Sequence, residues 1–278
     1  MEQGVCGMAL NRRVFLKELI YMEKKKRIMI TVAYDGTSYA GWQRQDNATA
    51  IEEVIENALL ELTGEAVDIA GASRTDAGVH AYGNVAVFDT GSSIPAGKFC
   101  MAINSYLPDD IRILDSVEVD PDFHPRYADS EKTYQYHILN TDIALPTMVR
   151  YAHHIYGKLD VDAMRAGASC LIGEHDFSAF CAAGSQVKSK IRTIYEISIE
   201  KTPLYDEDDV SDSDICIRIT GNGFLYNMVR IIAGTLIDVG LGRRSVESVE
   251  EALASGDRSR SGPTAPAKGL FLEGIEYI

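Results

Sequence analysis

The order of strand and helix signals between residues 28 and 119 is the feature that most limits how this chain can fold. Residues 28–33 (Ile-Met-Ile-Thr-Val-Ala) are typical of a buried strand, and the turn signal Asp35-Gly36 follows them. After a first helix, the signals predict strands over 66–70 and 83–88, a helix between Pro95 and Pro108, and a strand over 111–119. The order is β-α-β-β-α-β.

The first helix of this half is predicted to follow a capping box. Thr49 and Glu52 have the spacing in which each side chain satisfies a free backbone N–H of the first turn. The apolar positions between Ile51 and Leu62 fall on one helical face, and Gly64 stands where the helix should end.

The second half repeats the order. Its signals are a strand over 132–139, a helix capped by Asp160 and closed by Gly173, hairpin strands over 191–200 and 215–220, a helix over 225–239 stopped by Gly240, a shorter helix from Ser245, and a strand over 270–277. Two such halves in tandem predict an α+β fold of two ferredoxin-like units with a cleft between them. We expect one half over 27–126 and the other over 127–278.

Residues 1–26 differ from the rest, because they show no clear period and lack the apolar core of a signal peptide. Met22 is followed by Glu-Lys-Lys-Lys-Arg and is a plausible start. The hypothesis is that the first 21 residues are a mis-called start or a disordered tail.

Cysteine content and hydropathy exclude several classes of protein. The 278 residues contain five cysteines, which are scattered and never spaced as C-x-x-C. This pattern argues against a disulfide framework and a zinc site, and it fits a reducing cytoplasm. The most apolar stretch, Met228 to Leu241, is too short to span a bilayer and contains Arg230 and Asp238.

The formal net charge of −14 is unfavourable for nucleic-acid binding, which usually leaves a basic footprint. Much of the acidic excess is concentrated in an insert at 205–214, which is typical of a solvated hairpin tip. A local basic cleft would therefore be enough for a nucleic acid to bind.

The stretch Gly71-Ala72-Ser73-Arg74-Thr75-Asp76-Ala77-Gly78-Val79-His80-Ala81 joins two predicted strands. Its small residues let a bulky ligand approach the backbone, and loops between rigid strands often carry chemistry. Asp76 can serve as a nucleophile or a general base if a nearby cation keeps it ionised. The alternative is an ordinary turn made by Asp76 with Arg74 as its surface partner.

Three further segments carry side chains suited to a site. The first runs from Tyr34 to Gln45, and its aromatic, amide and guanidinium groups suit RNA bases, although a loop folded over Trp42 is the simpler interpretation. In the second, Tyr134 and Tyr136 share one face of a strand, where core packing is the alternative.

The third segment, Gly223-Phe224-Leu225-Tyr226-Asn227-Met228-Val229-Arg230, opens a helix. A partly buried Arg230 needs a partner, and a carboxylate in the cleft would serve, whereas a surface arginine is the default. No phosphate-binding loop, dinucleotide fingerprint, metal-ligand spacing or nucleophile elbow occurs, so the predicted chemistry uses no metal and no cofactor.

These segments together resemble the TruA family of tRNA pseudouridine synthases. The family's R-T-D-A-G-V-H-A, Y-D-G…Y-x-G-W-Q-R-Q, K/R-x-Y-x-Y and F-x-Y-x-M-V-R motifs occur in the family's order between about residues 28 and 275. Ser73 departs from the pattern, because the family usually has glycine there.

The resemblance implies a cytoplasmic, cofactor-free homodimer that isomerises uridine to pseudouridine in the anticodon stem-loop of tRNA, at positions 38–40. It gives Asp76 the catalytic role, pairs Arg230 with it, and places Tyr134 against the target base. Arg74 and His80 would contact the RNA backbone or fill the gap left by a flipped base. Two alternatives remain: a non-catalytic RNA-binding module, and a small-molecule enzyme on a ferredoxin-like fold, which suits the acidic composition better.

Overall fold

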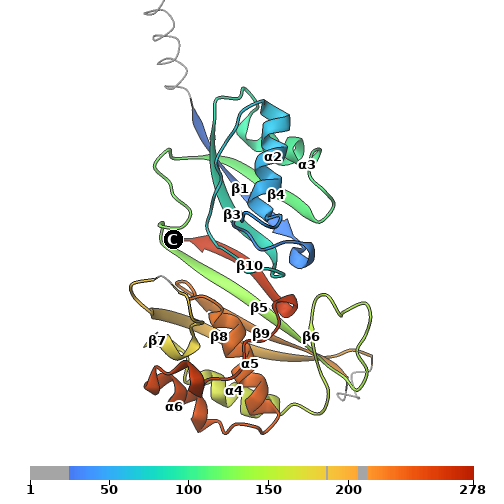
Figure 1. Cartoon of the computed structure of the whole chain (residues 1–278), viewed down its shortest axis with the longest axis vertical. Coiled ribbons are helices and arrows are strands. Elements are labelled where there is room, and N and C mark those ends of the chain that lie inside the picture. The colour runs from blue at the N-terminus through green and yellow to red at the C-terminus, as the bar shows by residue number, and fades with distance from the viewer. Residues whose placement is uncertain (1–24, 186, 206–211) are drawn as a thin grey trace, which may run out of the picture.

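One continuous sheet organises the molecule. The computed structural model describes residues 25–185, 187–205 and 212–278, so residues 1–24 of the predicted extension at 1–26 and most of the acidic run at 205–214 lie outside the described residues. The sheet has the strand order β4-β1-β3-β10-β5-β9-β8-β7, with β2 paired to β3 and β6 paired to β5 (Figure 1).

The N-terminal half follows the predicted element order. Its elements are β1 (Lys26–Tyr34), α2 (Ile51–Thr63), β2 (Ala70–Gly71), β3 (His80–Thr90), α3 (Phe99–Asn104) and β4 (Ile111–Val119). The strands are antiparallel, and β1 lies between β3 and β4. Every second residue of β1 from Ile28 to Tyr34 is buried, as expected for a strand with one face against helices.

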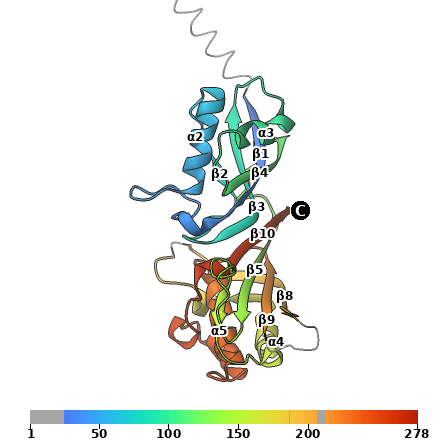
Figure 2. The ribbon, with the colours of Figure 1, turned by 90° about the vertical axis from the view of Figure 1, so that its right-hand side faces the viewer.

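The C-terminal half contains the remaining elements. They are β5 (Ser130–Asn140), β6 (His153–Ile155), α4 (Val161–Ser169), β7 (Gly173–Asp176), β8 (Ile191–Pro203), β9 (Ser213–Gly221), α5 (Met228–Gly240), α6 (Glu247–Ser255) and β10 (Leu270–Tyr277). Helix α4 contacts both α5 and α6 beside these strands. A 90° turn of the molecule shows the two halves stacked along its long axis (Figure 2). Helix α5 is apolar on nearly all sides and forms the centre of this half's core.

Strand β10 joins the two halves. It runs antiparallel to β5 along most of its length, and it also pairs in parallel with β3, where Phe271 lies opposite His80 and Leu272 opposite Ala81. The end of the Asp76 loop, which leads into β3, is thereby fixed against the C-terminal half.

Most predicted elements are confirmed, with four corrections in detail. Helix α5 begins at Met228 rather than at 225, and it includes Gly240, which was predicted to stop it. The predicted strand over 66–70 is wrong for its first part, since only Ala70–Gly71 pairs with β3. The backbone just before it turns instead toward α2, where the Ile69 N–H donates to Glu56 Oε1 at 3.1 Å.

The predicted capping box is also wrong. The residue before α2 is Ala50, which has no side-chain cap, while the Thr49 carbonyl accepts from the Ala40 N–H and the Glu52 carboxylate accepts from the Arg44 N–H. These groups therefore fix the preceding loop rather than the helix end. Gly64 does end α2, in the left-handed conformation.

Gly173 does not close α4, although Asp160 caps it as predicted, with Oδ1 accepting from the Ala163 N–H at 2.9 Å. The helix ends at Ser169, and Gly173 opens β7 at a φ of +109°, a conformation that glycine adopts readily.

Candidate active site

The Asp76 loop, residues 72–79 between β2 and β3, is held from behind by a buried amide. Asn84 on β3 has no exposed surface, and its Nδ2 donates to the Ser73 carbonyl at 3.0 Å and to the Tyr34 hydroxyl at 3.3 Å. The Tyr34 hydroxyl lies 2.7 Å from Thr75 Oγ1. Both neighbours of Arg74 in the chain are thus fixed by buried polar contacts, which are costly to break.

The segment after Tyr34 supports the same loop. The backbone N–H of Trp42 donates to the Thr75 carbonyl at 3.0 Å, and the backbone N–H of Gly78 donates to the Tyr39 carbonyl at 3.3 Å. Gly41 has a φ of +99°, and a Cβ there would lie 2.5 Å from the Thr75 carbonyl oxygen, so only glycine allows this approach.

Trp42 itself is 1% exposed. The predicted base-stacking surface is therefore not formed by Trp42, and the simpler interpretation of this segment, a loop folded over its tryptophan, is confirmed for that residue.

Asp76 meets Arg230 across the two halves. Arg230 Nη1 lies 3.2 Å from Asp76 Oδ2, although 154 positions separate the two residues. The side chains are 22% and 17% exposed, so the ion pair is largely shielded from solvent but remains accessible. A cation near a carboxylate favours its ionised form.

Other contacts fix the Arg230 guanidinium. Its Nε donates to the Ala265 carbonyl at 2.8 Å, and Nη1 also donates to Asn227 Oδ1 at 2.7 Å. Ala265 lies in the loop segment before β10, and its N–H in turn donates to the Arg230 carbonyl. Gly234 of α5 permits this approach, because a Cβ there would overlap the Pro263 carbonyl.

The environment of Asp76 acts on its protonation in two opposing ways. Burial raises the pKa of the Asp76 carboxyl above its usual range, while the charge and hydrogen bond of Arg230 lower it, and burial is the larger effect. A carboxyl whose pKa is raised toward neutrality is suited to proton transfer as well as to nucleophilic attack.

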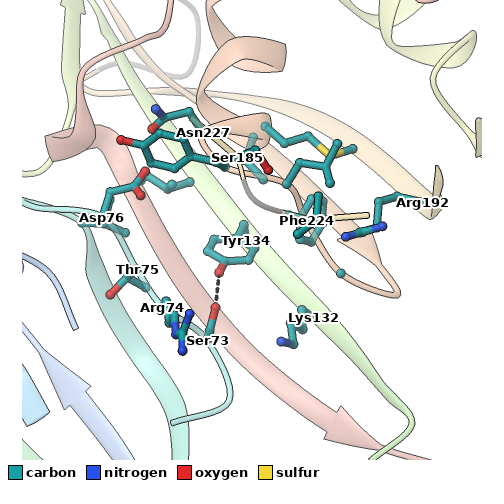
Figure 3. A pocket seen from close by; sticks show the side chains of 18 of the residues that line it. Ser73, Arg74, Thr75, Asp76, Lys132, Tyr134, Ser185, Arg192, Phe224 and Asn227 are labelled. Carbon is teal, nitrogen blue, oxygen red and sulfur yellow. Dashed lines mark hydrogen bonds between the residues drawn. The ribbon is translucent and has the colours of Figure 1, made fainter. Parts of the chain in front are cut away.

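Tyr134 lies in the wall of the same site, with its hydroxyl 2.6 Å from Ser73 Oγ (Figure 3). Its ring meets Phe224 edge to face at a centroid distance of 5.2 Å. Burial raises the pKa of Tyr134 to about 12, so the phenol keeps its proton at neutral pH. Tyr136, on the same strand face, is fully buried and donates to the Pro266 carbonyl, which makes it part of the core.

Ser73, Asp76 and Tyr134 line a cavity of about 780 Å³ that has walls from both halves. Asp76 and Asn227 lie at one side of the view in Figure 3, Lys132 and Arg192 at the other, and Tyr134 between them. The charged lining residues are one carboxylate, Asp76, and four cations: Arg74, Arg126, Lys132 and Arg192. The chain is acidic as a whole, yet this cavity is basic.

The four cations are available for a ligand. Among the described residues, no ion pair involves any of them. Arg74 is exposed, while Lys132 Nζ donates to the Ala72 carbonyl at 2.8 Å and Arg126 Nη2 donates to the Gly71 carbonyl at 3.0 Å. Burial, together with the charges of Arg126 and Arg192, lowers the pKa of Lys132 to about 8.

Sequence reasoning did not single out Arg126, Lys132, Arg192 or Asn227. Lys132 was detectable, because it is two positions before Tyr134 on a strand and therefore shares its face. No pattern marks Arg126 or Arg192, which reach the cavity through the fold.

The structure does not bring His80 to this cavity. Its ring is 1% exposed and stacks on Phe271 at a centroid distance of 4.6 Å. Nδ1 lies 3.1 Å from the Gly36 N–H and also 3.1 Å from Asp35 Oδ1, and Nε2 lies 3.2 Å from the Arg150 carbonyl. Burial lowers the pKa of His80, so a neutral, structural imidazole results.

The described residues contain no group of three or more histidine, cysteine or acidic side chains that could hold a metal ion. Within the same residues, no helix has the length and apolar character needed to cross a membrane.

Comparison with known proteins places the chain in a family. The family model for tRNA pseudouridine synthase matches residues 30–128 and 168–277. A tRNA pseudouridine synthase A of Thermoanaerobacter sp. (strain X514) is 49% identical over 252 residues, which are 91% of this chain and all of the relative. The proteins of the same name from Acetivibrio thermocellus and Brevibacillus brevis are 45% and 46% identical over the same shares.

The family-model match includes the Asp76 loop and the start of α5 that carries Arg230, whereas the Tyr134 strand lies between the two matched segments. The chain belongs to the tRNA pseudouridine synthase family.

Proposed function

We propose that this chain isomerises uridine to pseudouridine in the anticodon stem-loop of tRNA, at positions 38–40, with Asp76 as the catalytic carboxylate. Family membership makes the chain a tRNA-modifying isomerase. The observation that carries the assignment of Asp76 is that it lines a basic cavity and contacts Arg230 at 3.2 Å. The reactive groups are the Asp76 carboxylate and the Tyr134 phenol, which line this cavity, and the Arg230 guanidinium, which contacts Asp76.

The reaction is an internal rearrangement. The bond between ribose C1′ and uracil N1 breaks, the base turns, and a bond forms between C1′ and C5. The proton lost from C5 is balanced by one gained at N1. Asp76 can contribute by attacking the sugar, by attacking the base or by accepting the C5 proton, and all three roles require its ionised form.

Arg230 and Tyr134 act on Asp76 and on the base. Arg230 supports the ionised form of Asp76 against the effect of burial and orients its carboxylate. The Tyr134 ring, held through Ser73 and Phe224, limits the movement of the detached uracil by stacking or edge contact.

The cations of the cavity bind the RNA. A target base inside a stem or a stacked loop must leave its stack to reach Asp76, which lies within the cavity. Arg74, exposed beside Asp76, is placed to contact the backbone or to fill the gap that the base leaves. Arg126, Lys132 and Arg192 are suited to phosphates. The buried position of His80 gives no support to its predicted contact with RNA.

We also propose the finer architecture, two tandem ferredoxin-like halves. Its support is the strand order, which is β4-β1-β3-β2 in the first half and β10-β5-β9-β8 in the second. Counted along the chain, the four strands are β1, β2, β3 and β4 in the first half and β5, β8, β9 and β10 in the second. In each half the fourth strand lies beside the first, and the second lies beside the third. Helices lie between the first and second strands and between the third and fourth.

The resemblance to the family further supports a homodimer with one tRNA across both subunits. A cytoplasmic location is supported by Cys100, Cys170, Cys181 and Cys216, which are all free thiols.

The test of the substrate is the position of the product. Purified protein is incubated with a full tRNA and with its isolated anticodon stem-loop, each carrying uridines at positions 38–40, and pseudouridine is mapped by a base-specific chemical reaction. The matched control carries cytidine at these three positions and uridine elsewhere. We expect product only in the first two RNAs.

Pseudouridine at other positions of the tRNA would contradict the assignment to the anticodon stem-loop, while the isomerase activity itself would stand. Tight RNA binding without product would favour the non-catalytic RNA-binding module. An absence of binding even at low salt, where phosphate contacts are strongest, would favour the small-molecule enzyme.

A further inference from the structure

The backbone at Asn227 is unusual. Among the described residues it is the one non-glycine residue with a positive φ, at φ 59° and ψ 11°. This left-handed conformation is disfavoured for L-residues and is tolerated best by asparagine and aspartate. Such a residue persists where the surroundings require it, and these places are often functional.

Helix capping does not account for this residue. Asn227 immediately precedes α5, where asparagine commonly caps a free N–H, yet its side chain makes no such bond. Its Oδ1 instead accepts from Arg230 Nη1 at 2.7 Å, the same nitrogen that lies 3.2 Å from Asp76 Oδ2. Asn227 also lines the cavity.

A neutral acceptor has a specific advantage here. The guanidinium is a donor only, so the amide oxygen must face it. An amide fixes one end of the guanidinium, Ala265 fixes Nε, and neither partner neutralises the charge that acts on Asp76. A carboxylate in place of the amide would compete with Asp76 for the same cation.

We propose that Asn227 is a positioning residue, whose left-handed backbone directs its amide oxygen at Arg230 and so holds the guanidinium against the carboxylate of Asp76. This inference rests on the proposed function, in which Asp76 is the catalytic group and Arg230 its partner.

The first variant is Asn227→Gly, because glycine adopts the positive φ without strain and lacks the amide. We expect a melting temperature equal to or above that of the wild type, kcat lower by about tenfold, corresponding to one strong hydrogen bond to a charged group, and KM changed by less than about twofold. The acidic limb of the plot of kcat/KM against pH should move to higher pH, since Asp76 loses part of the stabilisation of its ionised form.

The second variant, Asn227→Asp, keeps the acceptor and tolerates the same backbone, but it adds a carboxylate. Two carboxylates then share Arg230, and their repulsion raises the pKa of Asp76 further. The acidic limb should therefore move farther than in Asn227→Gly, which a purely structural role of Asn227 does not predict.

A double-mutant cycle with Arg230→Gln tests whether Asn227 affects catalysis through Arg230. Without the guanidinium, Asn227→Gly should change kcat by less than about twofold, because the two residues act as one unit. An equal loss in both backgrounds, or an unchanged kcat and acidic limb in Asn227→Gly alone, would overturn the proposal.

A readout without activity separates this inference from the proposed function. The pKa of Asp76 can be followed through the ¹³C shift of its carboxyl carbon during a pH titration of the free protein. A higher pKa in Asn227→Gly supports the positioning role even if the wild type forms no pseudouridine, whereas an unchanged pKa contradicts it in either case.

Discussion

Asp76 lies on the loop before β3, and His80, four positions later, is the first residue of β3; the surroundings of the two side chains differ in burial and in access to the cavity. Asp76 faces a basic cavity, keeps about a fifth of its side chain exposed, and has one charged partner from the other half of the molecule. His80 is buried, stacks on Phe271, and has both ring nitrogens near backbone groups, with Asp35 Oδ1 also 3.1 Å from Nδ1.

The difference shows that the two ends of this segment have different roles, one structural and one facing the ligand. His80 packs between Phe271 of β10 and the turn after β1. It therefore fixes the point at which the loop ends and β3 begins. The Asp76 end can then present a carboxylate to a ligand without moving. The two residue types alone do not reveal this division, since a histidine and an aspartate are both common catalytic groups.

The largest effect on activity should come from Arg230→Gln. Loss of a fixed charge at the reacting carboxylate is expected to lower kcat by about 10²–10³-fold. The acidic limb of kcat/KM should also move to higher pH, because the opposing effect of Arg230 on the raised pKa of Asp76 disappears. Steady-state rates between pH 5 and 8 measure both.

Arg243→Gln is the matched control, because Arg243 follows the other end of the same helix and its side chain is 68% exposed. An equal loss of activity in this variant would mean that the Arg230 effect reflects damage to α5.

Lys132→Met should have the next largest effect, on binding. Removing one phosphate contact is expected to raise KM for tRNA on the order of tenfold and to reduce the slope of log binding constant against log salt by about one. Binding isotherms at several salt concentrations test this. Lys98→Met, an exposed lysine outside the cavity lining, is the control and should leave the slope unchanged.

Ser73→Ala should have a smaller effect. Ser73 departs from the glycine usual in the family, yet its hydroxyl lies 2.6 Å from that of Tyr134. Losing one neutral hydrogen bond should lower kcat by about two- to tenfold. If Ser73→Ala is slower and the double variant with Tyr134→Phe is no slower than Tyr134→Phe alone, the contact acts through the tyrosine. Additive losses would contradict this.

His80→Gln should have the smallest effect on turnover, within about twofold for the folded protein, and a clear effect on stability. The pKa of His80 is lowered by folding, so the unfolded chain binds the extra proton and wild-type stability falls as the pH drops below about 6.5. Thermal unfolding between pH 5 and 8 should show a weaker pH dependence in the variant. A large loss of kcat with unchanged stability would place His80 in the chemistry after all.

Much of the fold follows from local patterns. The alternation of β1, the apolar face of α2 and the Asp160 cap are local in sequence, and the predicted strand over 111–119 coincides with β4. The errors at Thr49 and Gly173 have a common cause, since each residue serves a neighbouring loop or strand that the local pattern does not contain.

The site was predictable only in part. Asp76, Arg230 and Tyr134 stand in motifs whose order resembles the family, and the structure brings them together. The position of β10 between β3 and β5 could not be predicted, because a single strand pairs with partners more than a hundred residues away. That pairing closes the cavity and buries His80, which is why its placement differed from the expectation.

The most direct test of the account is tritium release from tRNA labelled at uridine C5, because this proton must leave when C5 becomes bonded to the ribose. Wild type and Asp76→Asn are compared at equal tRNA occupancy, which a binding assay establishes. We predict release by the wild type and none above background by Asp76→Asn. Equal release by both proteins would contradict the central claim, because the reaction would then proceed without the carboxylate that faces the basic cavity.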